Sequence, residues 1–204
     1  MKQLSVLSPA ETLLILKDKN AYIKELLKLT FMDLVLKQVL RVYEVQRQAN
    51  SNEAVRFYKY IEIGKNFKIH QPLNHEKIFL APFQKNESIQ ILFRHLVKIA
   101  YQNAKSESKL HQVIRLSPKI DRCFNRNLMQ SIFGGFSLTS TGQNLRNEIE
   151  VEISQLEKQL PPLILNNPQK AIDTIKSIHG NVLLLTNIEI DLIKQIDKDI
   201  LAEL

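Results

Sequence analysis

Histidines and paired carboxylates are among the side chains that most often do chemistry, and here their spacing matches no enzyme or metal motif. His70 and His75 lie five residues apart in a predicted loop and would need remote ligands to bind a metal ion. Glu148, Glu150 and Glu152 are two apart, so a helix would scatter them over different faces. The five histidines, none in a His-x-x-x-His or His-Glu-x-x-His arrangement, are His70, His75, His95, His111 and His179.

The chain also lacks the short motifs that bind nucleotides or activate a serine. It contains no Gly-x-Ser-x-Gly, no phosphate-binding loop and no dinucleotide fingerprint. Its one cysteine, Cys123, cannot form an internal disulfide, and its place on the apolar side of a predicted helix indicates a buried structural thiol. We therefore predict a protein that is not an enzyme, binds no metal or cofactor, and works in the reducing cytoplasm.

Basic residues at helical spacing are the best candidates for a function. Lys119, Arg122 and Arg126 are three and four residues apart in a helix predicted over 118–131, so they share one face. Asn125 lies among them, and all four are residue types that contact DNA. The alternative is an ordinary hydrated helix surface. Lys37 and Arg41, four residues apart, are the corresponding basic candidates in the first part of the chain.

Charge is distributed unevenly along the chain, whose net charge is +7. Residues 51–140 hold 14 Lys/Arg against 6 Asp/Glu, which is +8, whereas residues 141–204 hold 6 against 10, which is −4. The basic middle favours a nucleic acid or another anionic partner. The acidic end would form a separate face or screen the basic one.

Aromatic residues interleave with basic ones in the stretch "RFYKYIEI", residues 56–63. Tyr58 and Tyr60 alternate there with Arg56 and Lys59, as they do on some nucleic-acid-binding surfaces. The alternative is that Phe57 or Tyr58 packs the hairpin in which the stretch is predicted to lie.

Helices and one hairpin must position these residues in the first half. Ser8, Pro9 and Glu11 form the cap, first-turn proline and capping-box pattern of a helix that ends near Leu16. A second helix is predicted over 21–29, and Thr30 is predicted to cap a third over 31–40. Strands at 41–46 and 55–63 follow, and residues 71–87 read as an irregular connection with a buried stretch at 78–80.

The second half repeats this order of elements. Helices are predicted over 88–104, 106–116 and 118–131, before a short strand at 136–138. A long helix over 140–160 is predicted to end at Pro161, and two more helices follow, the last capped by Thr186 with Glu189. An apolar stripe on the long helix suits a protein partner, a second copy or the protein's own core: Leu145, Ile149, Ile153, Leu156 and Leu160.

Residues 136–145 resemble the junction of the last wing strand and the following helix in winged-helix proteins. Phe136 is the aromatic of that pattern, Leu138-Thr139 ends the strand, Gly142 is the small residue of the first helical turn, and Leu145 is the core contact. The resemblance covers about 70 residues and implies that the helix over 118–131 would enter the DNA major groove. The wing here is short and has no Lys or Arg, which speaks against phosphate contact by the wing.

We therefore predict an α+β, mainly α fold with two winged-helix-like units and a helical C-terminal extension. The units span 1–70 and 88–160, the connection spans 71–87, and the extension spans 161–204. The predicted function is that of a non-enzymatic binding or adaptor protein, with nucleic acid as its most concrete partner.

A second resemblance offers an alternative function. Residues 7–45 are similar to the opening of Golgi phosphoprotein 3-type proteins, through Leu7, Glu11, Leu13, Leu14 and Arg41. This resemblance implies a peripheral membrane protein that binds phosphoinositides. No apolar run approaches the ~20 residues of a membrane span, so an integral membrane segment is not expected.

Overall fold

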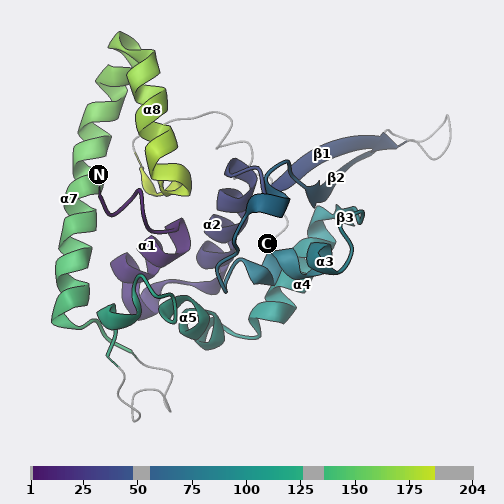
Figure 1. Ribbon diagram of the computed structural model, residues 1–204, viewed down its shortest axis with the longest axis horizontal. Helices are drawn as coiled ribbons and strands as arrows, with labels where there is room; N and C mark the ends of the chain where they lie inside the picture. The colour runs from purple at the N-terminus through teal and green to yellow at the C-terminus, as the bar shows by residue number, and fades with distance from the viewer. Residues whose placement is uncertain (1, 48–55, 126–135, 187–204) are drawn as a thin grey trace.

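The computed structural model describes residues 2–47, 56–125 and 136–186, which form a helical body with a protruding β-hairpin (Figure 1). The sheet has three antiparallel strands in the order β1-β2-β3, and helices make up most of the rest. The predicted class, α+β and mainly α, is confirmed.

The N-terminal helix forms as its sequence predicts. Helix α1 spans Pro9–Lys17, Ser8 is its N-cap, and Glu11 completes the capping box. The next helix, α2, spans Ile23–Leu36 without a break, so the prediction of two helices divided at Thr30 was wrong. The helix continues through Thr30 because the buried stripe extends on both sides of it. Thr30 donates its hydroxyl to Leu26 O inside the helix and does not cap a new one.

The predicted hairpin is confirmed and carries the sheet. Strands β1 (Leu40–Arg47) and β2 (Arg56–Ile63) pair from Leu40 opposite Ile63 to Arg47 opposite Arg56. Strand β3 (Ile91–Leu92) adds to β2. At the base of the hairpin Gly64 is required, because a Cβ there would lie 2.1 Å from Gln38 O.

The predicted irregular connection contains a helix. After the turn η2 (Phe67–Ile69), helix α3 spans Lys77–Lys85 with Pro82 inside it. A proline at position 82 leaves the carbonyl of residue 78 without its helical donor. Asn103 Nδ2 donates to Ile78 O at 3.0 Å, which is how this short helix tolerates the proline.

Helices α4 (Phe93–Ala104) and α5 (Glu107–Arg115) follow β3, and Ser106 caps α5. Helices α3 and α4 pack together, and β3 joins the sheet of the first part of the chain. Residues of the predicted units 1–70 and 88–160 thus lie in one hydrophobic core, and the division into two winged-helix-like units stays a prediction.

The longest helix runs past the point where the sequence suggested a stop. Helix α7 spans Ser140–Asn166 and continues through Pro161 and Pro162. Leu163 packs against the core and α8 (Pro168–Ile178) packs back on α7, so tertiary packing outweighs the two prolines. The short helix η4 (His179–Leu184) then packs on α1 and α2.

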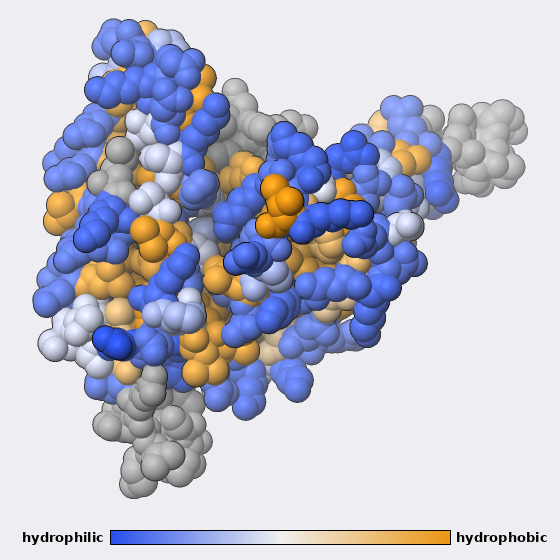
Figure 2. All heavy atoms as spheres, viewed as in Figure 1, coloured by the Kyte–Doolittle hydropathy of each residue, from blue (hydrophilic) through white to orange (hydrophobic). Residues whose placement is uncertain are grey.

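The surface of the viewed face is mainly hydrophilic (Figure 2), with hydrophobic patches over the region of α1 and α5. The apolar stripe predicted on α7 is turned inward. Ile149, Leu156 and Leu160 are buried, and Leu145 and Ile153 pack against the same core. A partner or second copy bound through 140–160 would have to use another face of α7.

Candidate functional site

The helix predicted over 118–131 is not formed in its described part, residues 118–125. Ser117 O accepts from both Ile120 and Asp121, a single turn leads into η3 (Asp121–Cys123), and Phe124 pairs as an isolated bridge with Leu138. The prediction of a DNA-recognition helix here was wrong over these residues. The backbone instead pairs with residues 137–139, which holds the start of α7.

The candidate contacts on this segment therefore share no helix face. Lys119 is exposed and donates from Nζ to Val6 O at 2.5 Å, and Arg122 is exposed in η3. Asn125 donates to Ser137 Oγ and Leu138 O, so its amide supports the bridge. Arg126 lies outside the described residues.

The junction that suggested a winged helix does have the local geometry expected of it. Thr139 caps α7 by accepting from Gly142 N at 3.1 Å. A Cβ on Gly142 would lie 2.3 Å from Cys123 O, so glycine is needed for this close approach. Cys123 is buried, as expected, and its desolvation raises the pKa of the thiol. The strand of the predicted wing is reduced to the bridge at Leu138.

Lys37 lies far along the chain from these residues, in a group of ionisable side chains between α1, α2 and α3. We call this group the buried ionic cluster; it consists of Glu11, Asp33, Lys37, His70, His75 and Glu76. Lys37 Nζ lies 2.6 Å from Asp33 Oδ2 and 3.6 Å from Glu76 Oε1. Its ammonium is thus held by two carboxylates that are at most 2% exposed.

The remaining members tie further segments to this cluster. Glu76 Oε2 accepts from Leu73 N and lies 2.9 Å from His70 Nε2. His75 Nε2 lies 3.3 Å from the hydroxyl of Ser8, the cap of α1. The sequence did not predict this cluster and placed His75 only in a loop, because nothing local signals a buried charge.

Burial controls how these groups titrate. Desolvation raises the pKa of Asp33, although Lys37 beside it acts in the opposite direction. Burial alone would lower the pKa of Lys37, but the carboxylates of Asp33 and Glu76 outweigh it and raise that pKa. Desolvation lowers the pKa of His75, so its imidazole is neutral near neutral pH.

The buried ionic cluster is closed to substrates and unsuited to a metal. Ser8, Glu11, His75 and Glu76 are all buried. Within the described residues, no three His, Cys, Asp or Glu side chains are placed to hold a metal ion. The bonds of the cluster connect α1, α2 and the start of α3, so its role is structural. The bond from Gly180 N to Asp33 Oδ1 adds η4 to this set.

Arg41 lies on a surface of a different kind, the outer face of the hairpin. Arg41, Tyr43, Tyr60 and Arg47 form what we call the tyrosine–arginine face. The two tyrosine rings stack with centroids 5.8 Å apart, and the guanidinium groups of Arg41 and Arg47 lie 6.0 and 5.8 Å from the rings of Tyr43 and Tyr60. Both arginines are exposed and both tyrosines are half-buried.

Strand register decides which residues of "RFYKYIEI" belong to this face. Tyr60 is opposite Tyr43, so Tyr58 and Arg56 share their side of the hairpin. Lys59 is opposite Glu44 and points to the other side with Phe57. The sequence signalled the aromatic and basic alternation, but Tyr43 and Arg47 were missed because the cross-strand partners depend on the register.

Arg41 also makes an ion pair that orients it. Its Nε donates to Glu62 Oε1 at 2.8 Å, and its Nη2 contacts the same oxygen. Gln90 donates to the other oxygen of Glu62 at 3.0 Å. Arg41 nevertheless keeps 67% of its side chain exposed, so it can contact a ligand without leaving Glu62.

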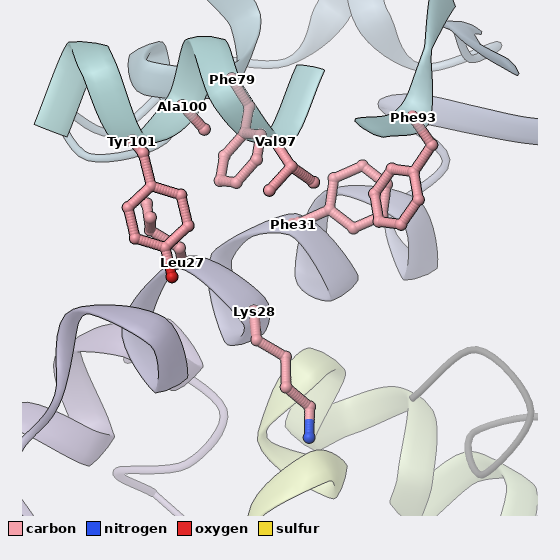
Figure 3. A pocket seen from close by; sticks show the side chains of 8 residues that line it. All are labelled: Leu27, Lys28, Phe31, Phe79, Phe93, Val97, Ala100 and Tyr101. Atoms are coloured by element: carbon pink, nitrogen blue, oxygen red, sulfur yellow. The ribbon is translucent and has the colours of Figure 1, made fainter. Parts of the chain in front are cut away.

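An aromatic cavity lies between α2 and α4 (Figure 3). The rings of Phe79 and Phe93 lie 5.5 and 5.0 Å from that of Phe31, while Lys28 points away from them. The cavity holds about 10 Å³, room for about one water molecule. It is a packing defect of the core and too small for a ligand.

Comparison with known proteins adds no identity. No model of a protein family, no curated protein and no solved structure matches the chain. The resemblances to winged-helix and Golgi phosphoprotein 3-type proteins stay predictions. In the part of the chain that the structure describes, no helix is long and apolar enough to cross a membrane.

Proposed function

We propose that this is a non-enzymatic binding protein that holds single-stranded nucleic acid on the tyrosine–arginine face. The observation that carries the proposal is the stacked pair Tyr43–Tyr60 flanked on both sides by exposed arginines. Flat aromatic rings accept bases of any identity, and arginines beside them contact phosphates or stack on bases. The proposal places the protein in the cytoplasm.

Single strands are favoured over duplex by the chemistry of this face. A duplex hides its base faces, so stacking on Tyr43 or Tyr60 requires bases that are unpaired. The described part of the segment 118–131 offers no helix for a major groove. The basic middle of the chain, +8 over residues 51–140, would add electrostatic attraction.

Binding of labelled oligonucleotides about 12 nucleotides long, measured by fluorescence anisotropy, tests the proposal. At about 50 mM salt the protein should bind single-stranded RNA or DNA more tightly than duplex DNA of the same sequence. Tyr43→Ala should weaken single-strand binding about ten-fold or more, because stacking on one ring contributes ~1–3 kcal/mol.

Tyr22→Ala is the matched control, because Tyr22 is an exposed tyrosine at the other end of α2, about 20 Å from β1. Its affinity should equal that of the unaltered protein. No detectable binding of any single strand at low salt would refute the proposal. Binding to anionic vesicles in place of oligonucleotides would favour the membrane alternative.

A further inference from the structure

Strand β1 forms an edge of the sheet that the described part of the chain leaves open. The strand order is β1-β2-β3, so β1 is paired on one side only. Figure 1 shows β1 on the side of the hairpin that faces away from α3 and α4. Among the described residues, no backbone group of another element bonds to the backbone of Val42, Glu44 or Gln46.

The hydrogen-bond pattern of the hairpin fixes which backbone groups of β1 point outward. Gly64 N donates to Val39 O at 2.8 Å, so these two residues form a hydrogen-bonded pair at the base of the ladder. Because such pairs alternate, residues 41, 43, 45 and 47 bond to β2. Residues 42, 44 and 46 therefore present their N–H and C=O groups to the open side, as the addition of a further strand requires.

Strand β1 lacks the features that usually shield an edge strand from other chains. Its sequence, residues 40–47, contains no proline and no lysine, and it pairs with β2 residue by residue without a bulge. Arg41 and Arg47 stand on one face of the sheet and Glu44 on the other, so these charges do not block the edge. Val42, Tyr43 and Val45 are residue types that favour strands. The open edge is thus suited to pair with a further strand.

The sequence of β1 complements itself in one antiparallel register. In that register Tyr43 lies opposite Tyr43 of a second copy, and aromatic pairs of this kind stabilise a sheet. Arg41 lies opposite Val45. Val42 lies opposite Glu44 in a hydrogen-bonded pair that uses the outward backbone groups of both. A shift of two residues one way would set Glu44 against Glu44 and Arg41 against Arg47, which is unfavourable, and a shift the other way would shorten the pairing.

We propose that two copies of the chain pair through β1 in this register and form a dimer with one continuous sheet. The hairpin protrudes from the helical body (Figure 1), and antiparallel pairing places the two bodies toward opposite ends of the joined strands. On one face of the joined sheet, Tyr60 and Tyr43 of one copy are followed by Tyr43 and Tyr60 of the other. The dimer goes beyond the proposed function and does not rest on it, and its test contains no nucleic acid, so each proposal can fail alone.

Disulfide cross-linking between two variants of the full chain tests both the dimer and its register. The native thiol, Cys123, is buried and should not compete. Arg41→Cys in one copy and Val45→Cys in the other would face each other with Cα atoms about 4.5 Å apart, which suits a disulfide. Under mild oxidation, a mixture of the two variants should form linked dimers about ten-fold or more faster than either variant alone, because two copies of residue 41 would lie about 13 Å apart.

Two further variants separate pairing through β1 from other causes of cross-linking. Ser177→Cys, an exposed thiol on α8, gives the rate of collisions that do not involve β1. Glu44→Pro removes an outward N–H that does not bond β2, so it should abolish the dimer while the urea midpoint stays the same.

Sedimentation velocity gives the mass in solution, and the unaltered protein should show dimers at ~100 µM where Glu44→Pro shows single chains. Mixed cysteine variants that link no faster than Ser177→Cys would overturn the inference. So would an unaltered protein that sediments as a single chain at this concentration, or a dimer that survives in Glu44→Pro. If Glu44→Pro lowers the urea midpoint, the cross-linking rates decide alone.

Discussion

The buried ionic cluster and the tyrosine–arginine face both contain charged side chains. The charges of the cluster are paired and mostly buried, whereas the arginines of the face are exposed to solvent. In the cluster, Lys37 forms ion pairs with the buried carboxylates of Asp33 and Glu76. On the face, Arg41 and Arg47 lie over aromatic rings and remain exposed. Lys37 and Arg41 are only four residues apart in sequence, so a basic residue's role is set by the element that carries it.

The difference also separates stability from binding. Charges in the cluster can be removed only with loss of folding free energy, because their partners would be left buried and unpaired. Charges on the face are solvated, so their removal should leave the fold intact. Four predictions test this contrast, starting with the largest expected effect.

Asp33→Ala should lower the free energy of unfolding by about 3–5 kcal/mol. The change removes the closest partner of Lys37 and leaves Gly180 N without its acceptor. Urea denaturation provides the measurement, with Asp173→Ala as the control, since Asp173 is an exposed aspartate on α8. A loss no larger than that of the control would show that the cluster does not hold the fold together.

Gly180→Ala should lower the free energy of unfolding by about 1–3 kcal/mol, because a Cβ at residue 180 would lie 2.3 Å from Asp33 Oδ1. Combining it with Asp33→Ala should reveal coupling, since the second change removes the two closest clashing atoms, Oδ1 and Cγ, and leaves only the Cβ of residue 33, at 2.9 Å. The double variant should therefore lose clearly less than the sum of the two single losses. Additive losses would mean that the two residues do not meet as described.

His75 should make stability fall as the pH falls. Its folded pKa lies below the ordinary value of 6.5, so the unfolded chain binds the proton more readily and acidification favours unfolding. The contribution is complete above about pH 6.5 and is lost as the pH drops below it. Between pH 7.5 and 5.5, the unfolding free energy of His75→Gln should therefore decline less than that of the unaltered protein.

The measurement is urea denaturation of both proteins across that pH range. Glu11, Glu76, Asp33 and Lys37 also act on His75, but they remain in the variant, which isolates the histidine. Parallel pH profiles for the two proteins would contradict the assignment of a neutral, buried imidazole.

Arg47→Gln should change the free energy of unfolding by less than about 0.5 kcal/mol, because the side chain is exposed. The same variant should bind single strands more weakly and with a shallower dependence on salt concentration, by about one phosphate contact. Arg94→Gln is the control, an exposed arginine on α4. A large loss of stability in Arg47→Gln would remove the contrast between the two regions.

Local signals in the sequence predicted local structure well. The cap at Ser8 follows from side-chain chemistry within a few residues, and the junction at Thr139 and Gly142 follows the short pattern that carries the winged-helix resemblance. The hairpin was predicted because alternation is also a short-range pattern. These features need no knowledge of the rest of the molecule.

Features that depend on distant partners were missed. In helix α3, the side chain of Asn103 replaces the backbone donor that is lost at Pro82. The segment 118–125 forms no α-helix and instead pairs with residues 137–139. The tyrosine–arginine face needs the register between β1 and β2, and the buried ionic cluster needs residues 11, 33 and 76 to meet. None of these contacts can be predicted from a short stretch of sequence, because the partners are distant along the chain.

Several hydrogen bonds that hold the first residues of the chain come from residues about 150 or more positions later in the sequence. Glu152 accepts from the backbone of Gln3 and Leu4, and Asn181 Nδ2 donates to Leu4 O and Leu7 O at 2.7 Å. During synthesis, this N-terminal turn leaves the ribosome about 113 residues before Lys119, which donates to Val6 O, about 150 before Glu152 and about 175 before Asn181. The N-terminal turn therefore lacks these hydrogen bonds until α7 and η4 have been synthesised, so the fold is completed only then.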